Sequence, residues 1–197
     1  MDINILIVGV GGQGTLLASR ILGQIAAIMD KDCKLSEVHG MAQRGGSVVT
    51  HVKIADKVNT PIIGFKEADI LLAFEQLEAL RYLDYLKDDG CAVVNTQKIA
   101  PMPVITGARE YPQDIIENIK KRIKNAVFLD AVSKAEELGN IKTVNVIMIG
   151  ALIKRLGIDI NIAKQALQAT VKEKFLDLNI KALEIGYNHE WKNKRRN

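Results

Sequence analysis

Glycines at a fixed spacing near the N-terminus carry the clearest chemical signal of the chain. Gly9, Gly11 and Gly14 match the pattern G-x-G-x-x-G, between an apolar run at residues 3–8 and a helical pattern that starts at residue 16. Because glycine has no Cβ atom, such a turn is tight and lets a phosphate approach the N-terminus of the following helix. The turn therefore predicts a binding site for an anionic group, formed by Gly9, Gly11, Gly12, Gln13 and Gly14.

A second candidate site lies in the loop at residues 37–46. Glu37 stands 23 residues after Gly14, about where a dinucleotide-binding fold places the acid that holds a ribose hydroxyl. Taken alone, this spacing favours a nicotinamide or flavin enzyme. A plainer interpretation also stays open, in which Glu37 forms a structural ion pair with Arg44.

The remainder of this loop favours a different ligand. It supplies a titratable ring, a fixed positive charge and flexible backbone, a combination that suits a carboxylate or a phosphate. The residues concerned are His39, Arg44, Gly45 and Gly46. For His39, a role in capping a turn is the competing interpretation.

The elements that must position these residues follow from hydrophobic periodicity. Strands are predicted at residues 3–8, 31–38, 47–54, 69–74, 91–95 and 126–129, with a short extended piece at 104–106 and a turn at 88–90. Helices are predicted at residues 16–29, 75–86, 115–124, 143–156, 160–171 and 179–189. The strand at 47–54 has one more polar face, so we expect it near an edge of the sheet.

Strands that alternate with helices indicate an α/β fold, a doubly wound Rossmann-like, mostly parallel sheet with a helical C-terminal third. We expect one domain over residues 1–197, with the helical extension starting at about residue 143. In such a sheet the loops after the first two strands emerge at the same carboxyl edge. The glycine turn and the loop at 37–46 should therefore border one crevice.

Other reactive side chains favour structural roles. His51 lies on the polar face of its strand and is expected at the surface, and His189 is expected in C-terminal packing. Cys33 and Cys91 are most simply buried small side chains. Gly150, inside an apolar helix, is expected to permit close helix packing.

Composition limits the partners. The net charge of +4 comes from Lys192, Lys194, Arg195 and Arg196, which leaves 23 basic and 23 acidic residues elsewhere, so we expect no nucleic-acid partner. No signal peptide is recognisable, and the longest apolar run, at 146–153, is far shorter than the ~20 residues that span a membrane. Two cysteines without a C-x-x-C pattern suit the cytoplasm and argue against a cysteine-ligated cluster within this chain.

The two motifs together carry a family resemblance. The segments GVGGQG at 9–14 and EVHGMAQRGG at 37–46, followed by the strand that begins SVV, resemble the γ-type domain of 2-oxoacid:ferredoxin oxidoreductases. Within that family the chain is most similar to the branch that acts on indolepyruvate. Related subunits that act on pyruvate, 2-oxoisovalerate or 2-oxoglutarate remain alternatives, as does a non-catalytic nucleotide-binding module.

The resemblance implies an enzyme that oxidatively decarboxylates aryl pyruvates to aryl-acyl-CoA and CO2 and reduces ferredoxin. Enzymes of this type hold Mg-bound thiamine diphosphate with a Gly-Asp-Gly motif, which this chain lacks. The resemblance therefore implies that thiamine diphosphate, Mg and the iron-sulfur clusters belong to a larger partner subunit. It also implies that the isolated chain is inactive and contributes a crevice for CoA or the 2-oxoacid at the subunit interface.

Overall fold

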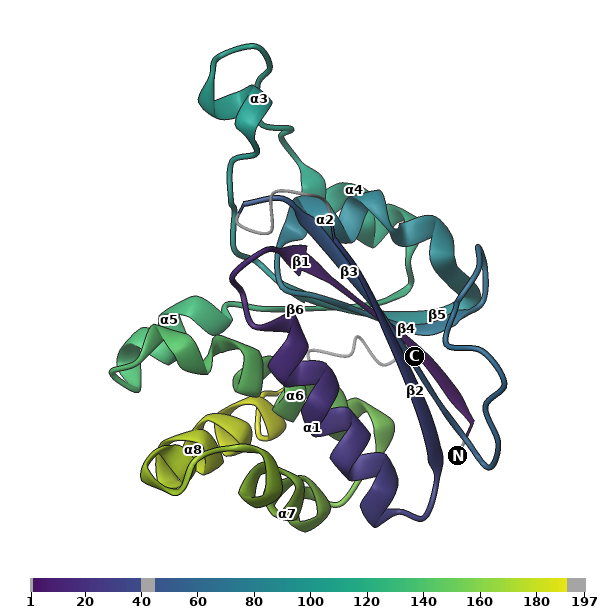
Figure 1. Cartoon of the computed structure of the whole chain (residues 1–197). Coiled ribbons are helices and arrows are strands. Elements are labelled where there is room, and N and C mark those ends of the chain that lie inside the picture. The colour runs from purple at the N-terminus through teal and green to yellow at the C-terminus, as the bar shows by residue number, and fades with distance from the viewer. Residues whose placement is uncertain (1, 40–44, 191–197) are drawn as a thin grey trace, which may run out of the picture.

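The computed structural model describes residues 2–39 and 45–190 (Figure 1). One sheet with the order β2-β3-β1-β4-β5-β6 forms the centre of the molecule. β1 pairs with β4, β4 with β5 and β5 with β6 in parallel, whereas β3 runs antiparallel to both of its neighbours. The strands are β1 (Ile3–Val10), β2 (Asp32–His39), β3 (Ser47–Ala55), β4 (Ala68–Ala73), β5 (Leu86–Asn95) and β6 (Asn125–Leu129). The predicted mostly parallel α/β sheet is confirmed.

Helices cover both faces of the sheet. On one face α1 packs with α5, α6, α7 and α8, and on the other lie α2 and α4 (Figure 1). The helices are α1 (Thr15–Ile28), α2 (Gln76–Arg81), α3 (Met102–Ile105), α4 (Ile115–Arg122), α5 (Ala131–Glu137), α6 (Val144–Leu156), α7 (Ile160–Thr170) and α8 (Leu176–Tyr187). The predicted helical C-terminal third is therefore present and packs against the sheet.

The central strand β1 is apolar on both of its faces because both are covered. Ile5 and Ile7 face the core beneath α1 and α6, and Leu6 and Val8 face the core beneath α2. All four side chains are 0 % exposed. Burial of one such side chain contributes about 1.5–3 kcal/mol to the free energy of folding. β1 therefore holds the start of the glycine turn firmly in place.

Two glycines let α6 and α8 approach closely. A Cβ atom on Gly150 would overlap the carbonyl oxygen of Leu183, and one on Gly186 would overlap the carbonyl oxygen of Ile147. Each helix thus offers a glycine to the backbone of the other. The packing role predicted for Gly150 is confirmed.

The prediction for His51 is wrong. β3 lies between β2 and β1, and the segment at residues 56–67 covers the face that carries His51, which is 7 % exposed. The Ile63 N–H donates to His51 Nδ1 over 3.1 Å. Burial, with a smaller effect from the Lys53 charge, lowers the pKa of His51. The alternating pattern of β3 could not reveal this cover, since a loop supplies it.

Three local predictions also need correction. The expected turn at 88–90 belongs to β5, whose pairing with β4 shifts register between Ala68 and Ile70. The helix expected at 75–86 ends at Arg81 and gives way to a short 3-10 turn. The extended piece expected at 104–106 is largely the short helix α3, since prolines fit the first turn of a helix.

The predicted burial of the two cysteines holds for Cys91, while Cys33 is only partly buried. His189 is half-buried at the end of the described chain, and burial is the main cause of its lowered pKa. The charged tail at 192–196 lies outside the described residues. No helix among those described is both long and apolar enough to cross a membrane.

Candidate functional site at the carboxyl edge of the sheet

The glycine turn and the second loop meet at the carboxyl edge. The Gly11 N–H donates to the Gly46 carbonyl over 2.8 Å, and the Gly45 N–H donates to the Gly11 carbonyl over 3.3 Å. Gly45 has a φ of 81°, a conformation that favours glycine. The predicted meeting of the two loops is therefore confirmed. Arg44 and residues 40–43 lie outside the described part of the chain.

The Gln13 side chain links the glycine turn to the segments that follow β4 and β5. Its Oε1 accepts from the Val10 N–H over 2.8 Å. Its Nε2 donates to the Phe74 carbonyl over 3.0 Å and to Gln97 Oε1 over 2.9 Å. Because these contacts use both amide hydrogens, the Gln13 side chain shapes the turn instead of presenting donors to a ligand.

The N-terminus of α1 offers donors of its own. α1 begins at Thr15 and has no side-chain N-cap. Within residues 2–39 and 45–190, the N–H groups of Gly12 and Gly14 donate to no protein acceptor. Gly11 differs, since its N–H is taken by Gly46. The turn therefore has the donors and the helix dipole that an anion needs, centred on Gly12 and Gly14.

At Gly14 the glycine turn contacts α6, the first long helix of the C-terminal third. The φ of Gly14 is 81°, and a Cβ atom there would overlap Nδ2 of Asn145, a side chain 5 % exposed at the start of α6. Asn145 Oδ1 accepts from the Val146 N–H over 2.8 Å, which holds the amide against the turn. The Asn145 amide also donates to the Gly14 carbonyl over 3.4 Å, and the positive φ of Gly14 would strain any other residue at this position.

Glu37 does not lie where a ribose-binding acid would. β3 separates β2 from β1, so Glu37 is one strand removed from the glycine turn. It is exposed, and its Oε2 accepts from Thr50 Oγ1 over 3.3 Å. His39 is likewise exposed at the end of β2. The inserted antiparallel strand weakens the dinucleotide interpretation.

Sequence reasoning missed two buried carboxylates at this edge. Glu78 is 4 % exposed; its Oε2 accepts from Ser47 Oγ over 2.6 Å, and its Oε1 lies 3.4 Å from Arg81 Nε. Burial is the main cause of its raised pKa. Glu75 is 1 % exposed and accepts from the Tyr111 hydroxyl over 2.6 Å. A pair of glutamates three residues apart directly after a buried strand was the available signal.

The cysteines do not fit a cluster. Cys33 lies on β2 and Cys91 on β5, four positions apart in the sheet order. With strands spaced about 4.8 Å apart, these thiols are roughly 19 Å from one another and cannot ligate one iron-sulfur centre. The described residues also contain no group of three or more His, Cys, Asp or Glu side chains placed to hold a metal ion.

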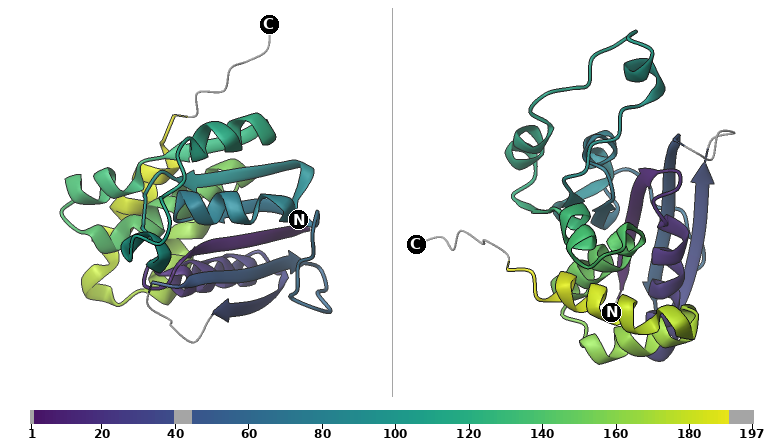
Figure 2. Two further views of the ribbon diagram at one scale, coloured as in Figure 1. Left: turned by 90° about the horizontal axis from the view of Figure 1, so that it is seen from above. Right: turned by 90° about the vertical axis from the view of Figure 1, so that its left-hand side faces the viewer.

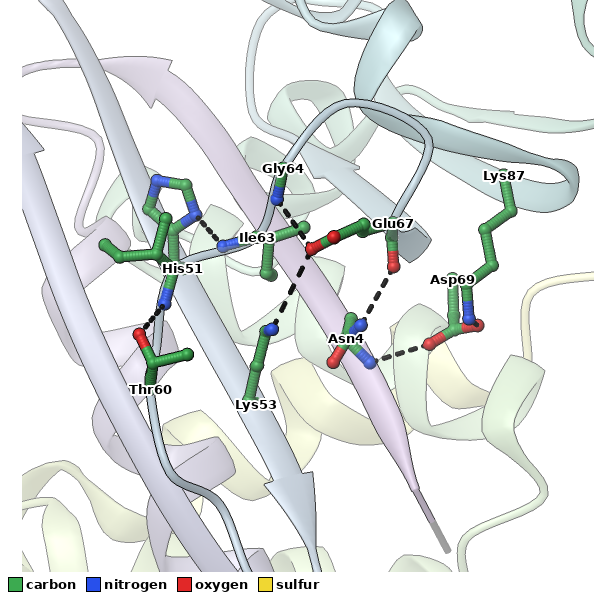
Figure 3. Close-up of polar contacts among 10 residues, drawn as sticks. Asn4, His51, Lys53, Thr60, Ile63, Gly64, Glu67, Asp69 and Lys87 are labelled. Atoms are coloured by element: carbon green, nitrogen blue, oxygen red, sulfur yellow. Dashed lines mark hydrogen bonds and ion pairs between the residues drawn. The ribbon is translucent and has the colours of Figure 1, made fainter.

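The opposite, amino edge of the sheet contains a cavity of about 340 Å³, and three of its charged side chains, Lys53, Asp69 and Lys87, form ion pairs. Asn4 N–H donates to Asp69 over 2.8 Å, and Lys87 pairs with the same carboxylate (Figure 3). Lys53 lies 3.9 Å from Glu67. These contacts tie β1, β3, β4 and β5 together at this edge.

Comparison with known proteins places the chain. The family described as pyruvate ferredoxin/flavodoxin oxidoreductase matches residues 4–189. A protein from Archaeoglobus fulgidus named indolepyruvate oxidoreductase subunit IorB is 40 % identical over 192 residues, which cover 95 % of each chain.

Two solved structures share the fold. The pyruvate oxidoreductase subunit PORC of Thermotoga maritima gives a TM-score of 0.74 at 20 % identity, over 98 % of this chain and 99 % of that one. The 2-oxoglutarate:ferredoxin oxidoreductase of Magnetococcus marinus, solved with 2-oxoglutarate, coenzyme A and succinyl-CoA bound, gives 0.71 at 18 % identity, over 94 % of this chain and 30 % of that one. The chain belongs to the pyruvate ferredoxin/flavodoxin oxidoreductase family.

Proposed function

We propose that this chain is the smaller subunit of an indolepyruvate:ferredoxin oxidoreductase, which converts aryl pyruvates to aryl-acyl-CoA and CO2 and reduces ferredoxin. The observation that carries the proposal is the 40 % identity, over nearly the full length of both chains, to a protein named as a subunit of indolepyruvate oxidoreductase. The whole of residues 1–197 would act as one γ-type domain, in the cytoplasm, where free cysteines such as Cys33 and Cys91 are stable.

Within that enzyme, the proposed role of this chain is to bind an anionic part of CoA or of the 2-oxoacid. The N–H groups of Gly12 and Gly14 and the N-terminus of α1 would receive the anion. Arg44 would add positive charge from the adjoining loop. Thiamine diphosphate, Mg and iron-sulfur clusters are proposed to reside in the larger partner, in keeping with the separation of the two cysteines here.

Co-purification with the larger subunit tests this proposal. Both genes would be expressed together without oxygen, with an affinity tag on this chain alone. We expect a brown, oxygen-sensitive complex that reduces ferredoxin when indolepyruvate and CoA are both supplied, and no activity from this chain by itself. A colourless homo-oligomer that retains no larger subunit would contradict the proposal.

A pyruvate-acting subunit is the second candidate, favoured by the description of the family itself. The purified complex separates the two, since the ratio of kcat/KM for indolepyruvate to that for pyruvate should be well above one under the main proposal. A free-standing nucleotide-binding module has less support, because β3 separates Glu37 from the glycine turn. Titration of the isolated chain with NAD, FAD and CoA would detect such a module as tight dinucleotide binding.

A further inference from the structure

A projecting segment at residues 96–114, here called the arm, leaves the body beside the candidate site. It follows β5 and contains α3, which stands well away from the sheet and its helices (Figures 1 and 2). α3 contains no buried residue, and its Met102 and Ile105 are 63 % and 65 % exposed. The stretch from residue 99 to 108 contains no charged residue, although 25 % of the chain is charged. The arm thus presents an apolar tip to its surroundings.

The base of the arm is held by a buried carboxylate. Glu75 Oε1 accepts from the Tyr111 hydroxyl over 2.6 Å and from the Ile99 N–H over 3.2 Å, while Oε2 accepts from the Glu78 N–H over 2.9 Å. Glu75 is 1 % exposed. The Glu75 side chain therefore holds both ends of the arm, at Ile99 and Tyr111, against the start of α2.

The tip is ordered as well. Pro101 precedes α3, and Pro103 lies in its first turn. The Arg109 N–H donates to the Pro103 carbonyl over 2.9 Å, and Thr106 Oγ1 donates to the Met102 carbonyl over 3.0 Å. An ordered element of this kind lowers the entropic cost of binding a partner.

We infer that the tip of the arm docks into an uncharged, apolar groove of the larger subunit. The inference rests on the proposed function. Gln97, at the base of the arm, accepts from Gln13 of the glycine turn over 2.9 Å, so a partner that extends from the tip to the base of the arm also borders the candidate site. Near the same turn, Leu16 at the start of α1 is a second apolar side chain that is 48 % exposed.

The comparisons favour a larger subunit over a second copy of this chain, because the relative from Archaeoglobus fulgidus is named as a subunit and the enzyme from Magnetococcus marinus contains this fold as 30 % of a longer chain. A stable interface needs on the order of 800 Å² from each partner. A four-residue helix cannot provide this area alone, whatever its partner. A partner that covers the arm together with the carboxyl edge can reach this area, and the apolar tip, with its adaptable methionine, then acts as its anchor.

The test compares two matched surface variants of this chain in the complex with the larger subunit. The double variant Met102→Asp/Ile105→Asp places charge on the tip, and Ile141→Asp changes an equally simple apolar residue, 50 % exposed, just before α6. Affinity for the purified larger subunit is measured by surface plasmon resonance under anaerobic conditions. We expect the double variant to bind about 100-fold more weakly and Ile141→Asp to bind like the wild type, with thermal midpoints unchanged because all three residues are exposed.

Each outcome separates the inference from the proposed function. Equal affinity of the double variant and the wild type would overturn the docking role and leave the function standing. A wild-type chain that binds no larger subunit would remove the proposed function and this inference with it. A third outcome is that the wild type is a homodimer, that the double variant is a monomer, and that both bind the larger subunit equally well. A second copy of the chain then covers the tip, and the inference is wrong.

Discussion

Glu78 is a carboxylate that the fold keeps almost entirely out of water. Because burial raises its pKa, ionisation of Glu78 in the folded chain costs free energy at neutral pH. We predict that Glu78→Gln raises the free energy of unfolding at pH 7.5, since the amide oxygen can still accept from Ser47. The gain should shrink as the pH falls through the raised pKa of the folded state, and it should vanish below about 4.5, where the wild-type carboxyl becomes protonated in both states. Urea denaturation at several pH values measures this difference.

The control for this prediction is Glu117→Gln, which changes an exposed glutamate on α4 that pairs with Lys120. It should alter stability little at any pH. A loss of stability for Glu78→Gln that does not depend on pH would contradict the prediction. A Glu78→Gln variant that is more stable but less active would show that the buried charge serves function.

Gly12 allows a test of the anion site by charge alone. Its φ is 104°, and among residues 2–39 and 45–190 no atom beyond its two chain neighbours lies within 4 Å of the position where a Cβ would be. Gly12→Asp and Gly12→Asn should therefore suffer similar backbone strain. We predict that the aspartate variant raises the KM for CoA about 10-fold above that of the asparagine variant, measured with the assembled enzyme.

Equal KM values in these two variants would place the anion elsewhere. Arg44→Ala supplies an independent measurement, because loss of its charge should raise the apparent KM for CoA or for the 2-oxoacid. If both KM values are unchanged in Arg44→Ala, this arginine has no part in the site.

At the scale of elements, the contact between α6 and α8 depends on two glycines. We predict that Gly150→Ala lowers the free energy of unfolding by about 1–3 kcal/mol, because the methyl group must push the two helices apart. Thermal and urea denaturation measure the loss. The matched control is Gly23→Ala in α1, where the nearest atom lies 3.8 Å from the added carbon.

This control should stabilise the chain by about 0.5–1 kcal/mol, since alanine favours a helix more than glycine does. A lower free energy of unfolding for Gly150→Ala and a higher one for Gly23→Ala would show that the loss at Gly150 comes from tertiary packing and not from helix propensity. A Gly150→Ala variant as stable as the wild type would mean that α6 and α8 can separate freely.

Elements with strong periodicity could be predicted from the sequence, and those defined by tertiary contacts could not. The helix at α1 and the buried strands β1 and β4 follow from runs of apolar residues. The cover over His51 comes from a loop, whose packing leaves no periodic trace. The register shift that draws the 88–90 segment into β5 likewise depends on pairing with β4.

For the whole molecule, the burial of histidines makes stability depend on pH. Burial lowers the pKa of His51 and of His189 in the folded chain, so the unfolded chain binds more protons below its ordinary histidine pKa of about 6.5. We predict that the free energy of unfolding falls as the pH drops below about 6.5. His51→Asn should weaken this dependence, because its amide oxygen can accept from Ile63 without titrating.

Chemical denaturation of the wild type and His51→Asn between pH 5.5 and 7.5 measures the effect. Glu78 acts in the opposite direction over the acid part of this range, and comparing the two proteins cancels its contribution. Parallel curves for the wild type and His51→Asn would show that His51 is not the group that titrates.

The location of the candidate site was predictable because a topological rule fixes it. Loops that follow parallel strands share the carboxyl edge, and Gly11 and Gly46 do bond there. Glu75 and Glu78 were not predictable from the motifs, since their burial depends on β3 and on the arm. Glu37 shows the converse, as its spacing suggested a role that the strand order does not favour.

The hydrogen bond between Gln13 and Gln97 joins the glycine turn to the base of the arm. Under our proposals, one end of this bond borders the ligand and the other borders the partner subunit. Thermodynamic linkage then requires reciprocity. If ligand binding changes the affinity between the two subunits by some factor, binding of the partner subunit changes the affinity for the ligand by the same factor. In that case the small subunit would also couple substrate binding to enzyme assembly.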